Sequence, residues 1–274
     1  MCGIVGIVSN KSVSASIISA LKKLEYRGYD SAGISTISNG QINEQKCSGR
    51  VDNLEKILFQ NPSSGDLGIG HVRWATHGVP NQVNAHPHSS EVVSVVHNGI
   101  IENSDELRKE YKEKGYSFKS QTDTEVITIM LTDYLKKENL INCIHKTLEK
   151  LEGSFALGVI FKDFDNLVVG ARRGSPLAVG YGHNENFIGS DSYALKSMTN
   201  KISYLDDGDF CILFKEKVEF YNSDKKKINK QIFELSKEDN TADKGDYRDF
   251  MSKEINEQSA TTKKCINEYL DKSR

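Results

Sequence analysis

The sequence has 274 residues, with 38 acidic and 36 basic side chains and a formal net charge of −2. This length suits one large domain or two small ones. The near balance of charges does not indicate a surface that binds nucleic acid or membranes non-specifically. Five widely spaced cysteines without a CxxC pair argue against a disulfide framework or a zinc site. The short N-terminal apolar run fits neither a signal peptide nor a membrane span, so we predict a cytoplasmic protein.

The first 60 residues predict a strand, a helix and a β-hairpin. An apolar run at 3–8 predicts a buried strand. Apolar residues at helical spacing predict a helix over 13–25. Asn39 and Gly40 are a strong hairpin signal between the expected strands, which are placed at 33–37 and 41–47. A short helix is expected over 51–59.

The middle of the chain mixes strands and helices before strands take over. We expect a strand at 67–74, a long polar loop at 75–91 and an apolar strand at 92–97 that ends at Asn98 and Gly99. Helices are expected over 103–113, 122–137 and 141–151. The later strands are predicted at 155–161, 167–171, 177–181, 186–189, 202–205, 209–214 and 217–221, with a helical turn at 191–197.

The order of these elements predicts a layered α+β domain. Two packed sheets with helices outside account for strands at both ends and helices between them. The order lacks the regular βαβ alternation of a dinucleotide-binding fold. Residues 236–246 are polar without an apolar period and predict a linker, followed by a helix over 247–270. We therefore divide the chain into a domain at 1–235 and a linker with a C-terminal helix at 236–274.

Cys2 is the first candidate for chemistry. If Met1 is removed, Cys2 carries both a thiol and a free α-amino group. The amine has an unperturbed pKa of about 7.7 to 8.0 and the thiol about 8.5, so the amine can take the thiol proton near neutral pH. This is the N-terminal-nucleophile arrangement, which needs no separate base. The alternative is a small buried side chain at the start of a strand.

The segment at 70–78, GHVRWATHG, gathers polar groups after a predicted strand. It offers the guanidinium of Arg73, the indole of Trp74, the hydroxyl of Thr76 and the imidazole of His77. An arginine can bond both oxygens of a carboxylate, which makes Arg73 a candidate for binding one. A surface arginine that pairs with a nearby acid is the alternative.

Asn98 and Gly99 follow the apolar strand at 92–97. An Asn side-chain amide beside a Gly backbone N–H can donate two hydrogen bonds to a developing oxyanion. Taken alone, Asn-Gly is better explained as a turn.

Asp123 stands at an expected helix start, within TDTEV. Capping of that helix by Asp123 or Thr122 is the better interpretation of this segment, and pairing with a substrate ammonium is the alternative. Five histidines crowd the segment 71–97, but their spacing fits no zinc template, so we expect no metal. No phosphate-binding glycine loop of the GxxxxGK type is present, and we expect no flavin or nucleotide.

Several motifs together resemble one family. The motifs MCGIVG, YRGYDSAG, RWATHG, NAHPH, HNGIIEN, TDTEV, GSPL, SD and DKGDY occur in the order found in class II glutamine amidotransferases, and most closely in the glutaminase domain of glucosamine-6-phosphate synthases. The resemblance runs from Cys2 to about Gln258. It implies an N-terminal-nucleophile hydrolase fold, a four-layer αββα sandwich of two mainly antiparallel sheets.

The resemblance also implies roles for individual residues. Cys2 is the expected nucleophile, and Asn98 with Gly99 the expected oxyanion hole. Arg73, helped by Thr76 and His77, is expected to bind the α-carboxylate of glutamine. Asp123 is expected to bind the α-ammonium. Trp74 is expected at the gate through which ammonia leaves, and Arg27 is expected to support the nucleophile.

The expected activity is hydrolysis of L-glutamine to L-glutamate and ammonia. The ammonia would aminate fructose 6-phosphate, which binds to isomerase domains that this sequence lacks, in an enzyme expected to be a homodimer. A catalytically silent glutamine-binding module, or a glutaminase that serves another sugar or a phosphoribosyl acceptor, is the alternative. Asp249 and Ser259 depart from the family's tail, where His and Pro are expected, and this leaves the acceptor open.

Overall fold

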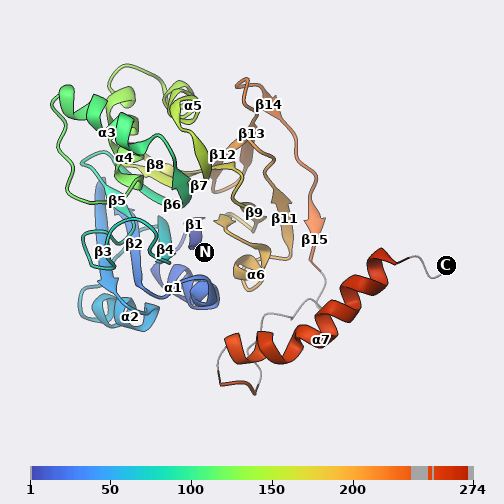
Figure 1. The fold of residues 1–274 in the computed structure, drawn as a ribbon. Helices are drawn as coiled ribbons and strands as arrows, with labels where there is room; N and C mark the ends of the chain where they lie inside the picture. Colours follow the sequence, from blue (N-terminus) through green and yellow to red (C-terminus); the bar gives the residue numbers. More distant parts are fainter. Residues whose placement is uncertain (1, 236–245, 249, 271–274) are drawn as a thin grey trace. The chain divides into compact units, whose positions relative to one another are not determined.

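The computed structural model describes residues 2–235, 246–248 and 250–270, and it divides the chain into two compact units, Met1–Leu235 and Ser236–Arg274 (Figure 1). The second unit contains helix α7, Phe250–Tyr269, which includes Ser259. Its apolar side chains Met251, Ile255 and Ile266 are exposed. Asp249 lies outside the described residues.

The first unit contains two antiparallel sheets. Among the described residues, eight strands form the first sheet, in the order β15-β11-β9-β10-β1-β4-β2-β3. Their bounds are β1 Gly3–Val8, β2 Ser31–Ser38, β3 Gln41–Ser48, β4 Leu67–Arg73, β9 Ala178–Tyr181, β10 Asn186–Gly189, β11 Lys201–Tyr204 and β15 Phe233–Glu234. Strand β1 lies near the middle, where glycines at positions 3 and 6 accept the close approach of neighbouring side chains.

Seven described strands form the second sheet, in the order β14-β13-β12-β8-β7-β6-β5. Their bounds are β5 His88–Ser89, β6 Val93–Ile101, β7 Gly153–Phe161, β8 Phe164–Arg173, β12 Phe210–Phe214, β13 Val218–Tyr221 and β14 Lys227–Ile228. The short strands β5, β14 and β15 carry too few apolar residues for the sequence pattern to predict them.

Three apolar layers hold the sheets and helices together. One layer lies between the sheets and includes Ile4, Val96 and Ile188. A second packs the first sheet against α1 Ser14–Leu24, α2 Val51–Gln60 and α6 Ser192–Leu195. A third packs the second sheet against α3 Ser104–Glu113, α4 Thr124–Leu135 and α5 Leu140–Lys150. Figure 1 shows these two helix groups beside different sheets, which confirms the predicted αββα layering.

Strand β6 runs further than the sequence pattern predicts. It continues to Ile101, and Asn98 and Gly99 pair with Ala156 and Phe155 of β7. The interpretation of Asn98 and Gly99 as a turn is therefore wrong. Gly99 has φ +127°, and a Cβ there would lie 1.9 Å from the Ser154 carbonyl oxygen, so this strand needs glycine at that point.

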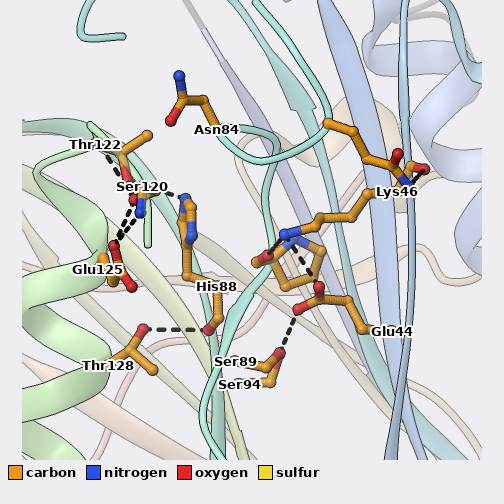
Figure 2. A network of polar contacts seen from close by, with 12 residues as sticks. Glu44, Lys46, Asn84, His88, Ser89, Ser94, Ser120, Thr122, Glu125 and Thr128 are labelled. Carbon is orange, nitrogen blue, oxygen red and sulfur yellow. Dashed lines mark hydrogen bonds and ion pairs between the residues drawn. The ribbon is translucent and has the colours of Figure 1, made fainter. Parts of the chain in front are cut away.

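A polar network joins the two sheets at their edges (Figure 2). Ser89 of β5 donates a hydrogen bond to Glu44 of β3, at 2.5 Å. His88 pairs through Nε2 with the Thr122 hydroxyl at 2.9 Å, and its backbone carbonyl accepts from Thr128 of α4 at 3.1 Å. The end of the loop expected at 75–91 is thus fixed between β3 and α4.

Candidate active site

A cavity of about 320 Å³ contains most of the residues that the sequence selects for chemistry. Its walls come from the start of β1, the 3₁₀ turn η1 (Glu25–Arg27), the loops after β4 and β8, and the end of β6. They consist of Cys2, Arg27, Trp74, Thr76, Asn98, Gly99, Ile100, Ser175 and Pro176. Arg73, His77 and Asp123 are predicted site residues that do not line it.

A larger hollow, of about 820 Å³, lies between α5 and strands β8, β12 and β13. Its lining includes Leu140, Phe164, Phe214 and Tyr221 but no cysteine, serine, histidine or lysine. The smaller cavity is the candidate active site, because the larger hollow contains none of the residues that the sequence selects for chemistry.

The Cys2 thiol is held by the backbone at the start of the loop after β4. Its Sγ accepts a hydrogen bond from Trp74 N at 3.2 Å and lies 3.4 Å from the Trp74 carbonyl oxygen. Burial raises the pKa of the Cys2 thiol, and the Trp74 contact and the Arg73 charge oppose that rise only in part. The thiol therefore needs a base to become a nucleophile near neutral pH.

Asn98 links the nucleophile residue to the interior. Its Nδ2 donates to the backbone carbonyl of Cys2 at 3.0 Å and to Ser190 Oγ at 2.8 Å. The same Ser190 Oγ accepts from Ile4 N at 2.6 Å. An amide donor thus stands one hydrogen bond away from the residue that carries the thiol.

Arg27 contributes a neutralised charge to the cavity wall. Its guanidinium pairs with Asp191 at 2.8 Å, and the hydroxyl of Tyr26 donates to the same carboxylate at 2.7 Å. Burial and this carboxylate raise the pKa of Tyr26 to about 12. Asp191 also accepts from Ala194 N and caps α6. Arg27 is therefore placed to brace the site rather than to bind a free anion.

Arg73 is buried rather than paired at the surface, so the surface alternative is wrong: only 3% of it is exposed. Its Nη2 donates to the carbonyl oxygens of His77 and Gly78, which shapes the loop after β4. Its Nη1 is buried without a hydrogen-bond partner among the described residues. Burial lowers the pKa of Arg73, and the charge of Asp123 opposes that effect. A buried guanidinium nitrogen with spare hydrogens can receive a carboxylate.

Asp123 does not cap a helix. It occupies the N-cap position of α4, but its side chain makes no capping hydrogen bond, so that prediction is wrong. Its Oδ2 instead accepts from Ile101 N at 2.8 Å, at the end of β6. Asp123 is 9% exposed, and its carboxylate lies close enough to Cys2 and Arg73 to affect the pKa of each.

The remaining predicted site residues lie on the loop after β4. Thr76 and His77 are exposed, and His77 Nδ1 lies 3.4 Å from Thr76 Oγ1. Trp74 is 47% exposed and meets Tyr29 edge to face, with 6.2 Å between ring centroids. These side chains are held much less firmly than Asn98 or Arg73.

Four histidines form a buried cluster next to the cavity: His71, His86, His88 and His97. His71 and His86 stack at 4.3 Å, and Thr124 Oγ1 lies 2.7 Å from His86 Nε2 and 2.9 Å from His97 Nδ1. Burial lowers the pKa of all four, that of His71 to about 3. Within the described residues no group of His, Cys, Asp and Glu side chains is arranged to hold a metal ion.

Comparison with known proteins points in the same direction as this geometry. Residues 71–197 match the family model described as a glutamine amidotransferase domain. A glutamine–fructose-6-phosphate aminotransferase (isomerizing) of Mesorhizobium japonicum is 48% identical over 272 residues, which are 99% of this chain and 45% of that protein. One from Clostridium acetobutylicum is 50% identical over 260 residues, 94% of this chain and 43% of that protein. Residues 71–197 carry a glutamine amidotransferase domain.

Solved structures show the same fold at lower identity. The glutamine phosphoribosylpyrophosphate amidotransferase of B. subtilis aligns with a TM-score of 0.68 at 24% identity, over 81% of this chain and 49% of that one. A glutamine aminotransferase class-II domain protein from Silicibacter pomeroyi aligns with a TM-score of 0.59 at 13% identity, over 81% of this chain and 99% of that one. Both share the layered α+β fold of this domain. The chain spans less than half the length of the curated relatives it matches.

Sequence reasoning assigned no role to three residues that hold the site. Ser190 and Asp191 follow β10 and reach Asn98 and Arg27, respectively. His71 contacts Asn98 from β4. A serine and an aspartate directly after a buried strand were the available signal for the first two.

Among the helices of the described residues, none combines the length and the apolar composition that a membrane span requires.

Proposed function

We propose that this amidotransferase domain hydrolyses L-glutamine to L-glutamate and ammonia with Cys2 as the nucleophile. The observation that carries the proposal is the contact between the Asn98 amide and the Cys2 backbone, at 3.0 Å, beside a cavity that also contains the thiol. A nucleophile and an oxyanion donor at one cavity are what amide hydrolysis needs.

The chemical steps follow from this pair. After removal of Met1, the α-amino group of Cys2 takes the thiol proton, and the thiolate attacks the side-chain amide carbon of glutamine. Asn98 and Gly99 stabilise the resulting oxyanion. The protonated amine then donates its proton to the departing nitrogen. The C–N bond breaks, ammonia departs, and a γ-glutamyl thioester on Cys2 remains. Water cleaves the thioester, which releases glutamate and restores the thiol.

The other predicted residues bind the zwitterionic end of glutamine in this proposal. Arg73 receives the α-carboxylate with its spare Nη1, and Asp123 pairs with the α-ammonium. Thr76 and His77 move toward the carboxylate when substrate binds, because their exposed loop can adjust. Trp74 gates the exit of ammonia, and Arg27 braces the nucleophile end through Asp191.

We further propose that the ammonia aminates fructose 6-phosphate to glucosamine 6-phosphate. Support comes from the relatives named for that reaction, which are 44–50% identical over nearly the whole chain. The phosphoribosylpyrophosphate amidotransferase shares only the fold at 24% identity, and this disfavours a phosphoribosyl acceptor. In this proposal residues 1–235 are the glutaminase domain and 236–274 lead toward an isomerase region, in a cytoplasmic homodimer.

Intact mass and glutamate release test the proposal together. We expect purified protein to lack Met1 and to release glutamate from glutamine, and we expect Cys2→Ala to abolish release while the protein stays folded. Full turnover by Cys2→Ala, or by protein that keeps Met1, would contradict the mechanism. Removal of Met1 without turnover would favour the silent glutamine-binding module.

A further inference from the structure

His71 Nε2 contacts two acceptors on β6: the backbone carbonyl of His97 and one end of the side-chain amide of Asn98. It lies 3.0 Å from the backbone carbonyl oxygen of His97 and 3.1 Å from Oδ1 of Asn98. A backbone carbonyl can only accept, so Nε2 must carry the proton and donate. A donor at Nε2 then requires oxygen, not nitrogen, on the facing end of the Asn98 amide.

A second fixed carbonyl constrains the other end of the same amide. Asn98 Nδ2 lies 3.0 Å from the Cys2 carbonyl oxygen, which accepts a hydrogen bond and cannot donate one. The Asn98 amide thus contacts the Cys2 carbonyl directly and the His97 carbonyl through His71. Of the two orientations that differ by exchange of the amide oxygen and NH₂ group, only one gives every contact a donor and an acceptor. In that orientation the NH₂ group faces Cys2.

The burial of His71 keeps this arrangement constant. The ring is fully buried, which lowers its pKa to about 3, so it remains neutral across the physiological range. A neutral ring with its proton on Nε2 has none on Nδ1, and Nδ1 is indeed without a partner among the described residues. The stacked ring of His86, at 4.3 Å, limits its rotation.

We propose that His71 is a positioning residue for the amide-cleaving step: its Nε2–H holds the Asn98 amide with the oxygen inward and the NH₂ group toward the nucleophile. This inference rests on the proposed function. Without His71, the amide can flip and present its oxygen to the developing oxyanion. The amide oxygen, which carries a partial negative charge, then faces the oxyanion in place of a hydrogen-bond donor, and the oxyanion is destabilised.

A matched pair of substitutions separates hydrogen bonding from packing. Gln and Met have unbranched side chains of similar length, and only Gln can donate to Asn98 and His97. We expect His71→Met to lower kcat for glutamine hydrolysis about 10- to 100-fold, somewhat less than direct loss of an oxyanion donor. KM for glutamine changes little, because the oxyanion forms only after binding. His71→Gln is expected to recover most of kcat.

Alkylation of Cys2 by iodoacetamide gives a readout that a general loss of structure would change. This displacement forms no oxyanion, so peptide mapping should find the same Cys2 alkylation rate in His71→Met and in the wild type. Equal kcat values for His71→Met and His71→Gln, whether normal or reduced, would overturn the role of His71. Slower alkylation in step with kcat would overturn it too.

A measurement on the unsubstituted protein covers the case in which His71→Met does not fold. Nitrogen-15 NMR of the histidine rings should show His71 as the neutral Nε2–H tautomer from pH 5 to 8. The Nδ1–H tautomer would overturn the inference, since Nε2 could not then donate. Absence of glutamine turnover in the wild type would instead overturn the proposed function, and the role of His71 with it.

Discussion

The part of the cavity that strands carry and the part that the loop at 74–78 carries differ in how firmly their side chains are held. Asn98 is buried in β6, with hydrogen bonds at both ends of its amide. On the loop, Thr76 and His77 are exposed and share one contact of 3.4 Å. Asn98, assigned to bond-breaking, is thus fixed before substrate arrives, whereas Thr76 and His77, assigned to recognition, are free to adjust.

Arg73 combines features of the strand residues and of the loop residues. It ends strand β4 and is buried, yet its Nη2 donates to two carbonyl oxygens of the loop. Pre-organised donors serve a transition state best when they do not have to move. Recognition groups can move at less cost to the chemical step, so substitutions should lose more activity on the strands than on the loop.

The largest expected loss from this comparison is that of Asn98→Ala. Removing one oxyanion donor typically lowers kcat about 10²- to 10³-fold. Steady-state glutamine hydrolysis measures the loss. Asn186→Ala is the control, because Asn186 is also buried and donates to carbonyl oxygens but is absent from the cavity wall. Near-normal turnover by folded Asn98→Ala would remove Asn98 from the oxyanion hole.

Arg73→Lys tests the intermediate case. Lysine keeps a positive charge but cannot hold the loop carbonyls and a carboxylate with a planar fork. Losing a hydrogen bond to a charged group is worth about 1.5 to 3 kcal/mol, so we expect KM for glutamine to rise about 10- to 100-fold. Arg173→Lys makes the same change at an arginine whose guanidinium bonds the carbonyl oxygens of Leu148 and Leu151 at the end of α5 and does not line the cavity. Identical KM values in the two variants would contradict carboxylate binding by Arg73.

Because four histidines are buried in a cluster, we expect the stability of the folded protein to depend on pH. Burial lowers the pKa of all four rings in the folded protein, whereas the unfolded chain protonates them near pH 6.5. The free energy of unfolding should therefore fall as pH drops below 6.5, by about 1.4 kcal/mol per pH unit for each ring that stays neutral. Urea denaturation between pH 7 and 5 measures the slope. His71→Gln should reduce it by one ring's share, and an unchanged slope would contradict the assignment.

His77→Ala is expected to have the smallest effect. The side chain is exposed, and its contact with Thr76 is long. We expect KM for glutamine to rise by no more than about threefold, the value of a weak hydrogen bond. A rise as large as that of Arg73→Lys would show that the loop is as pre-organised as the strands, and would break the comparison.

The layered fold was predictable because periodicity reports burial, and each sheet buries both faces against an apolar layer. Runs such as 92–97 and 155–161 therefore appeared as strands in the sequence. The end of β6 was not predictable, because polar Asn98 and conformationally free Gly99 look like a turn when their partners Ala156 and Phe155 are unknown. Local pattern cannot show pairing between residues nearly 60 positions apart.

The candidate site divides in the same way. Cys2 and Arg73 were selected by the chemistry of their side chains, which the sequence shows directly. Taken alone, the segment around Asp123 favours a helix cap because the helix start is local, whereas the contact of Asp123 with Ile101 depends on the fold. Ser190 and His71 receive no role from the sequence, because their importance lies in their contacts with Asn98.

Both hydrogens of the Asn98 amide already have acceptors in the resting protein, the Cys2 carbonyl and the Ser190 hydroxyl. In the proposed reaction the incoming oxygen must therefore displace an existing acceptor. A neutral substrate carbonyl competes poorly with the two acceptors in place, and a full negative charge competes well. The resting contacts would thus act as a threshold, which withholds the amide until the tetrahedral species has formed.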